Sequence, residues 1–123
     1  MFKLMIVDDS NIIRNKISRG HDESKFSLVA TATNGLDAIA QFKKHQPDVI
    51  TMDLTMPEMD GIDCISTLMA LDPDVAILVV SALSDKATGI QALQMGARGF
   101  LLKPFTEEEL ENALNEITEQ VDV

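Results

Sequence analysis

The chain has 123 residues, which suits one domain, residues 1–123, that buries roughly two-thirds of the surface exposed in the unfolded chain. Its 20 acidic and 10 basic residues give a formal net charge of −10, which argues against nucleic acid or an anionic membrane as a partner and favours proteins or cations. Its apolar runs reach only about six residues, far below the roughly twenty of a membrane span, so we expect a cytoplasmic protein.

An apolar run at residues 2–7 predicts the first strand. Polar residues at 8–11 then mark the end of that strand and the start of a helix, which Arg19-Gly20 ends. Residues 21–27 are polar and predict a connection. We assign the inward face of the helix to Ile12, Ile13 and Ile17.

A second strand is predicted at residues 28–32. Asn34-Gly35 then opens a helix that ends before Pro47. Apolar residues recur along this helix at helical spacing, at Leu36, Ile39, Ala40 and Phe42.

The third unit begins with an apolar strand that starts at Asp48 and ends in an acid, Asp53. After a turn, Gly61 leads a helix that Asp72-Pro73 closes. Cys64 stands in this helix as the chain's one cysteine, which makes an internal disulfide impossible and predicts a small, half-buried apolar residue. The inward face is assigned to Ile62, Ile65, Leu68 and Met69.

The fourth strand, residues 75–80, is the most apolar and leads into Ser81-Ala82. A helix follows from Ser84 or Asp85 to Met95, with Gly96 as a left-handed stop. Gly89 lies inside this helix and costs about 1 kcal/mol relative to alanine, which predicts a marginal helix.

The last unit begins with a strand at 99–102 that leads into Lys103-Pro104. Thr106 and Glu109 form a capping box for the last helix, the best-specified element of the chain. Its apolar stripe is Leu110, Ala113, Leu114, Ile117 and Val121.

These five strand–helix units predict an α/β fold. Strands that are apolar throughout need cover on both faces, which indicates a parallel sheet between helices, and right-handed crossovers limit how it can be wound. We predict the doubly wound, flavodoxin-like strand order 2-1-3-4-5, whose switch point lies between strands 1 and 3. Asp8-Asp9 and Asp53 end those two strands.

Three carboxylates at neighbouring strand ends predict a cation site. At an effective dielectric constant near 20, two such charges about 4 Å apart repel by on the order of 4 kcal/mol, a cost that a hard divalent cation removes. Mg²⁺ suits a few carboxylates, a backbone carbonyl and waters, and it commonly bridges to phosphoryl groups. Taken alone, Asp8 and Asp9 are equally well read as the acid pair of a helix N-terminus.

Ser81 and Lys103 end the fourth and fifth strands, so they face the same rim beside Asp53. A hydroxyl, an ammonium and Mg²⁺ around one carboxylate would stabilise phosphoryl oxygens on it, with Asp53 as the nucleophile of an aspartyl phosphate. Taken singly, the serine is a common turn residue and the lysine a common solvated residue.

At this point the sequence closely resembles the receiver domain of two-component response regulators, of the free-standing CheY-like kind, over essentially its whole length. The resemblance rests on four motifs, which are Val-Asp-Asp-Ser at 7–10, Met-Asp-Leu-Thr-Met-Pro-Glu-Met-Asp-Gly at 52–61, Ser81-Ala82 and Gly-Phe-Leu-Leu-Lys-Pro-Phe at 99–105.

The resemblance implies a phosphoacceptor response regulator that takes a phosphoryl group from a histidine kinase or phosphotransfer protein, and that is no enzyme beyond its own phosphorylation and dephosphorylation. It implies Asp53 as phosphoacceptor, Asp8 and Asp9 as the Mg²⁺-binding pair, the backbone carbonyl of Thr55 as a further metal ligand, and Lys103 as the phosphate-pairing lysine. The residues identify no particular kinase, target or pathway, and they do not decide between a free-standing domain and part of a larger protein.

The resemblance also implies a switch, with Ser81 as its hydroxyl residue and Phe100 as its aromatic residue. Ser81 stands where threonine is commoner, and Phe100 lacks the hydroxyl of the tyrosine often found there, so the strength of coupling is open. The expected partner surface is the fourth helix, the fifth strand and the fifth helix of a monomer. A cis peptide is also expected at Lys103-Pro104.

Two positions are expected to set the lifetime of the phosphorylated state, Thr55 and Leu83, two residues beyond Asp53 and Ser81. Leu83 offers no hydrogen bond to an attacking water, and Thr55 lacks the reach of a longer amide or carboxylate side chain. We therefore expect slow self-dephosphorylation, unless both residues merely cover the loop.

Two other classes share part of this pattern. A flavodoxin-like electron carrier has the same winding, but two acids after the first strand would repel a flavin phosphate. A Mg²⁺-dependent aspartate-nucleophile phosphohydrolase has similar chemistry, but such enzymes usually place the nucleophile after the first strand and carry a cap domain for which this chain has no room.

Overall fold

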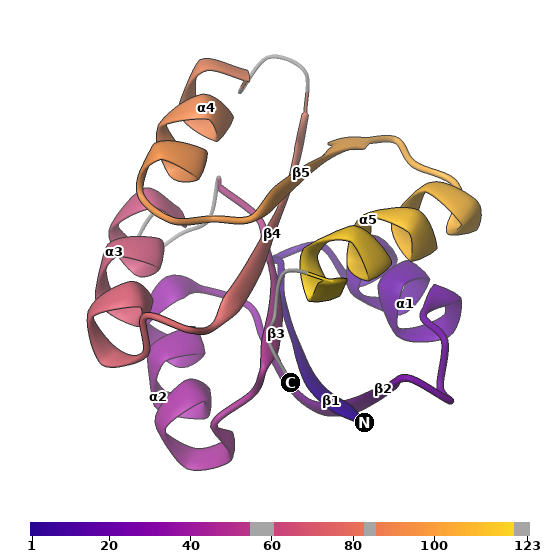
Figure 1. The fold of residues 1–123 in the computed structure, drawn as a ribbon, viewed down its shortest axis with the longest axis horizontal. Helices are drawn as coiled ribbons and strands as arrows, with labels where there is room; N and C mark the ends of the chain where they lie inside the picture. The colour runs from indigo at the N-terminus through magenta and orange to yellow at the C-terminus, as the bar shows by residue number, and fades with distance from the viewer. Residues whose placement is uncertain (55–60, 83–85, 120–123) are drawn as a thin grey trace.

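A computed structural model describes residues 1–54, 61–82 and 86–119 of the chain. Five parallel strands form one sheet in the order β2-β1-β3-β4-β5, with helices on both faces, as the sequence predicts (Figure 1). The elements in chain order are β1 Phe2–Val7, α1 Asn11–Gly20, β2 Phe26–Ala32, α2 Gly35–His45, β3 Val49–Met52, α3 Gly61–Leu71, β4 Ala76–Ala82, α4 Lys86–Gln94, β5 Gly99–Lys103 and α5 Glu107–Glu119.

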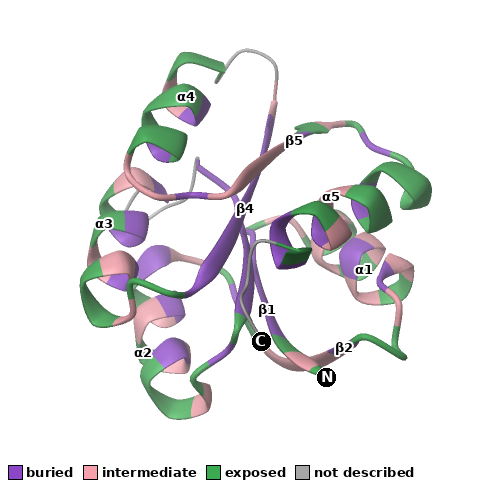
Figure 2. Ribbon diagram, in the orientation of Figure 1, coloured by how far each residue is buried: buried purple, intermediate pink, exposed green. Residues whose placement is uncertain are grey.

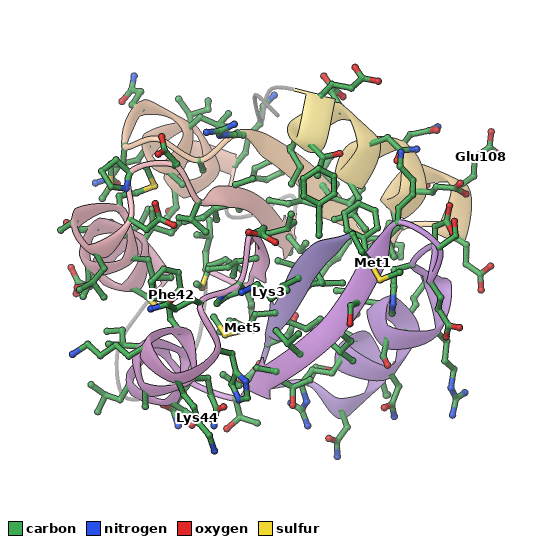
Figure 3. The ribbon with its side chains drawn as sticks, turned by 60° about the horizontal axis from the view of Figure 1, so that its bottom comes forward. Met1, Lys3, Met5, Phe42, Lys44 and Glu108 are labelled. Carbon is green, nitrogen blue, oxygen red and sulfur yellow. The ribbon has the colours of Figure 1, made fainter. Side chains whose placement is uncertain are left out.

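The sheet divides the apolar core into two clusters. One lies under α2, α3 and α4, and in Figure 3 Met5 and Phe42 mark its part between α2 and the sheet. The other lies under α1 and α5, around Ile17, Phe105 and Leu110. Figure 2 shows the inner strands β1 and β4 buried between helices that are exposed on their outer sides, whereas the edge strands β2 and β5 are mostly intermediate. Within the described ranges, no helix is long and apolar enough to cross a membrane.

Several local predictions are confirmed. The side chain of Glu109 accepts from the Thr106 backbone N–H at 3.0 Å, and the Thr106 hydroxyl accepts from the Glu109 N–H at 3.1 Å, which completes the capping box. Gly96 has a φ of 120°, as the predicted left-handed stop requires. The Lys103–Pro104 peptide is cis. The first residues predicted for the fourth helix and Val121 of the last helix lie outside the described residues.

Two helix faces differ from the prediction. Ile12 is 79% exposed, because only Ile13 and Ile17, four residues apart, share the inward side, and Ile12 projects about 100° away from Ile13. In α2 the buried residues are Gly35, Ala38 and Phe42, so Phe42 faces inward as predicted. Of the other three residues assigned to that helical pattern, Ile39 is partly buried, and Leu36 and Ala40 are exposed.

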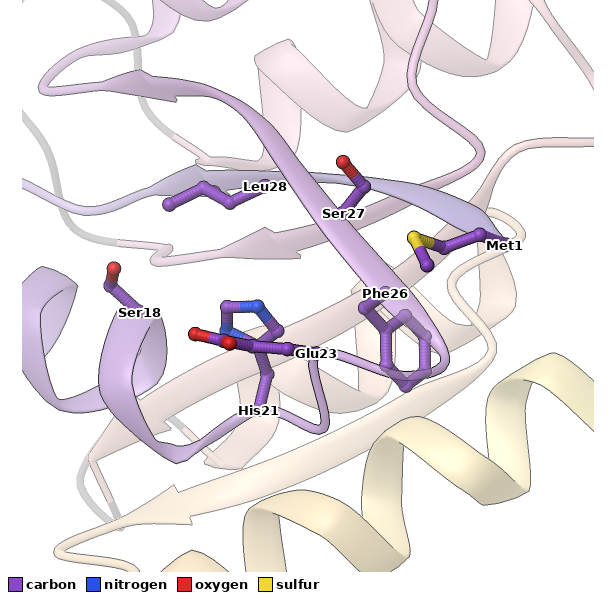
Figure 4. Close-up of a pocket in the computed structure, with 7 residues that line it drawn as sticks. All are labelled: Met1, Ser18, His21, Glu23, Phe26, Ser27 and Leu28. Atoms are coloured by element: carbon purple, nitrogen blue, oxygen red, sulfur yellow. The ribbon is translucent and has the colours of Figure 1, made fainter.

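The connection before β2 also differs. The strand begins at Phe26, two residues earlier than predicted, because Phe26 pairs with Phe2 and is buried in the α1–α5 core. His21, predicted to be part of a polar connection, is buried, and its Nδ1 lies 3.1 Å from the Ile17 carbonyl oxygen. His21 lines a small pocket with Glu23 and Phe26 at the start of β2, away from the three acids (Figure 4). Cys64, predicted to be half-buried, is fully buried and donates to the Gly35 carbonyl.

Candidate functional site

The three predicted acids meet at the carboxyl edge of the sheet. Val7 and Met52 are paired neighbours at the ends of β1 and β3, so the residues that follow them emerge side by side. The backbone N–H of Asp53 donates to the Val7 carbonyl at 2.9 Å, which fixes this arrangement. Carboxylate oxygens of Asp8, Asp9 and Asp53 all lie within 4.8 Å of one another. Asp8 and Asp53 are only 1% and 5% exposed, whereas Asp9 faces solvent.

Asp8 is held by the start of α1. Its Oδ1 accepts from the Ser10 N–H at 2.9 Å, and Ser10 in turn caps the helix by accepting from the Ile13 N–H. Arg14 donates to the Asp8 carbonyl oxygen at 2.6 Å. These contacts place a buried carboxylate with little freedom to rotate, which is the preorganisation that a ligand site needs.

Lys103 is the cation that the structure places among these acids. Its Nζ lies 3.0 Å from Asp8 Oδ2 and 3.6 Å from Asp53 Oδ1. Asp8 Oδ2 is nevertheless buried without a well-aligned hydrogen bond from any described residue, so the ammonium contributes Coulombic attraction rather than a directed bond.

This charge balance fits a divalent cation. Among the described residues, one ammonium against three carboxylates leaves an excess of negative charge at a mostly buried edge, where charge is costly. The Asp8 oxygen that lacks an aligned donor has a lone pair to offer a metal. Hard oxygen donors of this kind suit Mg²⁺, which accepts a few carboxylates and completes its shell with water.

The loop after β5 positions Lys103. Phe105 follows the cis Lys103–Pro104 peptide and is buried in the α1–α5 core. Lys16 of α1 donates to the Phe105 carbonyl oxygen, and its Nζ lies 4.5 Å from the centre of the Phe105 ring. Both ends of the short segment are thus anchored, which holds the ammonium at the acids.

Ser81 lies in β4, the strand next to β3, and Phe100 lies in β5, where it pairs with Val79 of β4. Ser81 is fully buried and still within β4, where it pairs with Leu102, and its neighbour Ala82 pairs with Lys103. Phe100 is partly buried against the core under α2, α3 and α4. Thr55 and Leu83, the two predicted lifetime positions, lie outside the described residues.

Three residues that support this site were given no role in it from the sequence. Arg14 and Lys16 are the two described above, and no local pattern marks a basic residue in α1 as a loop anchor. The third is Gly61, whose N–H donates to the Leu54 carbonyl at 2.9 Å. A Cβ at Gly61 would lie 2.7 Å from the Asp53 carbonyl oxygen, so any side chain would push against the segment that carries Asp53. Gly61 was expected only to lead the helix, and its place at the end of the motif at 52–61 was the available signal.

The chain is similar to known proteins over almost its whole length. Residues 4–115 match the family model described as the response regulator receiver domain. The chemotaxis protein CheY of Listeria monocytogenes is 39% identical over 114 residues, which are 93% of this chain and 96% of that protein.

Solved structures show the same relation. The receiver domain of AraT, a response regulator from Geobacillus stearothermophilus, has a TM-score of 0.91 at 27% identity, covering 97% of this chain and 94% of that one. A CheX–CheY complex from Borrelia burgdorferi with BeF₃ and magnesium has a TM-score of 0.84 at 31% identity, covering 96% of this chain and 87% of that one.

Proposed function

This chain belongs to the response regulator receiver domain family and is a CheY-like receiver of two-component signalling, and we propose that Asp53 is its phosphoacceptor. The observation that carries the proposal is the charge arrangement, in which Lys103 lies within 4.0 Å of both Asp8 and Asp53 at an edge with an excess of carboxylates. Asp53 is the nucleophile because it follows β3, at the centre of the sheet, and lies between Asp8 on one side and the β4 hydroxyl of Ser81 on the other.

The reaction is transfer of a phosphoryl group to a carboxylate. An Asp53 oxygen attacks the phosphorus of a phosphohistidine on a histidine kinase or phosphotransfer protein. The new O–P bond forms as the P–N bond breaks, and the imidazole of the donor leaves with the electron pair and takes a proton from water. Lys103 pairs with an oxygen of the transferred group, and the Ser81 hydroxyl donates to another.

A magnesium ion would be held by Asp8, Asp9 and Asp53, with the backbone carbonyl of Thr55, outside the described residues, as a further ligand. When bound, Mg²⁺ supplies positive charge that offsets the charge of the phosphoryl oxygens. The Borrelia burgdorferi CheY complex, named with BeF₃ and magnesium, supports this choice of ion by likeness. Apart from phosphorylating and dephosphorylating itself, the domain catalyses no reaction.

The output is a protein partner that binds at α4, β5 and α5. Phosphorylation draws the Ser81 hydroxyl toward Asp53 and makes room for Phe100 to rotate inward. The free energies of the two conformers need differ by only a few kcal/mol. Large apolar side chains on α4 and β5 support this surface, because Ile90, Leu93 and Leu102 are each about half exposed. An apolar helix or loop of a partner fits such a patch.

The chemistry is tested by incubating the protein with Mg²⁺ and acetyl phosphate and measuring its intact mass. We expect one phosphoryl group, removed by hydroxylamine as an acyl phosphate is. Asp53→Asn should abolish it, while Asp74→Asn, at an exposed acid on the opposite edge of the sheet, should leave it unchanged. Persistent labelling of Asp53→Asn at another residue would defeat the assignment.

The partner surface is tested separately by NMR with fluoroberyllate and Mg²⁺. Shift changes should extend from the acids to α4, β5 and α5. Changes restricted to the acids, α2 and α3 would contradict the proposed surface while leaving the chemistry intact.

A further inference from the structure

The Phe100 ring can occupy two positions on one face of the sheet. It pairs across the strands with Val79, and both residues pack into the core under α2, α3 and α4. Ser81 lies two residues beyond Val79 in β4 and therefore points to the same face. A diagonal neighbour of this kind is about 7–8 Å away, which is within reach of an aromatic side chain.

In this structure the Phe100 ring lies against α4 at Gly89. A Cβ built on Gly89 would lie 1.9 Å from Cε2, 2.5 Å from Cδ2 and 3.0 Å from Cζ of the ring. The ring therefore occupies the space that any other side chain at position 89 would fill. Gly89 is buried and faces Phe100 of β5, so α4 cannot offer that space by turning outward without losing contact with the sheet.

We propose that Gly89 is a positioning residue that sets the resting place of the Phe100 ring and with it the balance of the switch. An alanine at position 89 requires the ring to retreat by about 1.5 Å or more to restore ordinary van der Waals contact. The retreat that keeps the ring buried is along its own face of the sheet toward Ser81, because the alternative exposes an aromatic ring to water. This inference rests on the proposed function, in which the position near Ser81 is the phosphorylated one.

The test compares Gly89→Ala with the wild type in the absence and presence of fluoroberyllate with Mg²⁺. Ring-¹³C phenylalanine labelling gives five phenylalanines to resolve, and Phe100→Leu assigns the signals of Phe100. In the ligand-free variant these signals should move at least halfway toward their positions in saturated wild type. The fluoroberyllate concentration at half-saturation should fall about tenfold, because a ligand binds more tightly when its preferred conformer is already populated.

Two outcomes overturn the proposal. One is a Phe100 ring whose signals do not change in Gly89→Ala. The other is a ring that moves without any fall in the half-saturating concentration, which means that it has gone to solvent. In the double variant with Phe100→Leu, alanine at position 89 should no longer alter that concentration relative to Phe100→Leu alone, and a tenfold fall there would also overturn it. Circular dichroism checks that each variant is folded.

A matched control separates ring displacement from helix stabilisation. Gln91→Ala also raises the helix propensity of α4, but at an exposed position away from the ring, so it should behave as wild type. An equal fall in the half-saturating fluoroberyllate concentration in Gln91→Ala would assign the effect to stabilisation of the helix and reject the role of Gly89. If the wild type does not respond to fluoroberyllate, the Asp53 assignment is rejected, and this inference with it. If the wild type responds and Gly89→Ala has the same half-saturating concentration, only this inference is rejected.

Discussion

Replacing Lys103 with methionine should destabilise the metal-free protein by about 3 kcal/mol. The substitution keeps a long, unbranched side chain but removes the charge that lies 3.0 Å from Asp8 and 3.6 Å from Asp53. Removing one partner of a buried ion pair typically costs about 3–5 kcal/mol, because it leaves the other charge buried and uncompensated. The Lys103 side chain is 22% exposed, so water reaches the gap and the lower end of that range applies.

The assay is thermal unfolding followed by circular dichroism, since the chain has neither tryptophan nor tyrosine. For a domain of this size 1 kcal/mol corresponds to roughly 4 °C, so Lys103→Met should lower the Tm by about 12 °C in EDTA at pH 7. Saturating Mg²⁺ should recover more than half of this loss, because the ion neutralises the same carboxylates. Lys103→Arg keeps the charge and should lower the Tm much less. Lys44→Met is the control, because it removes the charge of an exposed lysine away from the acids.

Two results would refute the reasoning. A Lys103→Met protein as stable as wild type in EDTA would mean that the ammonium gives no net stabilisation to the buried acids. A loss that Mg²⁺ does not reduce would mean that the ion does not bind beside Asp8 and Asp53.

Three further predictions concern other parts of the chain. Thr51→Val should stabilise the protein by about 1 kcal/mol in urea unfolding, because the buried Thr51 hydroxyl finds no hydrogen-bond partner among the described residues; a loss of stability would reveal a partner. Hydrogen bonds from the hydroxyl and backbone N–H of Ser24 lower the pKa of Asp22, so this carboxylate adds a little stability that is lost as pH falls from its ordinary pKa through the lowered one. Ser24→Ala should raise the pKa in an NMR titration, and an unchanged pKa would contradict the role of the hydroxyl. Thr55→Asn combined with Leu83→Glu should speed loss of the phosphoryl group after donor removal, since one orienting contact to water is worth about 1–3 kcal/mol of barrier; decay no faster than in wild type would show that these positions do not set the lifetime.

The acid cluster was predictable because it follows from topology alone. Once the strands are parallel and in the order 2-1-3-4-5, residues after β1 and β3 must emerge at one edge, and Asp8 and Asp53 do so. The capping box follows from local residue types in the same way, whereas the cis peptide was expected only from the resemblance to receiver domains. The distances from Lys103 to the acids do not follow, because they depend on how α1 and the loop after β5 pack.

What the sequence could not predict are contacts between elements. Gly89 was interpreted as a weakness of its helix, since helix propensity describes a residue in isolation, yet its missing side chain is the space into which Phe100 packs. Ile12 was assigned to the inward face together with Ile13 and Ile17, and only the direction in which α1 faces the sheet separates Ile12 from the other two. Thr51 fits the pattern of a buried strand equally well with or without a hydrogen-bond partner.

The division of the core into two clusters bears on the order in which the chain folds. The helices α2, α3 and α4 are consecutive with the strands they cover, so that face can assemble through short loop closures. The α1–α5 face forms only when the two ends of the chain meet, and loop closure costs more entropy as the closed segment lengthens. We therefore expect the amide protons of α1 and α5 to exchange faster than those of α2, α3 and α4, through partial opening of the α1–α5 face. Asp8 lies near the start of the chain and Lys103 near its end. In a chain whose ends have not yet met, Lys103 is therefore not yet beside Asp8 and Asp53.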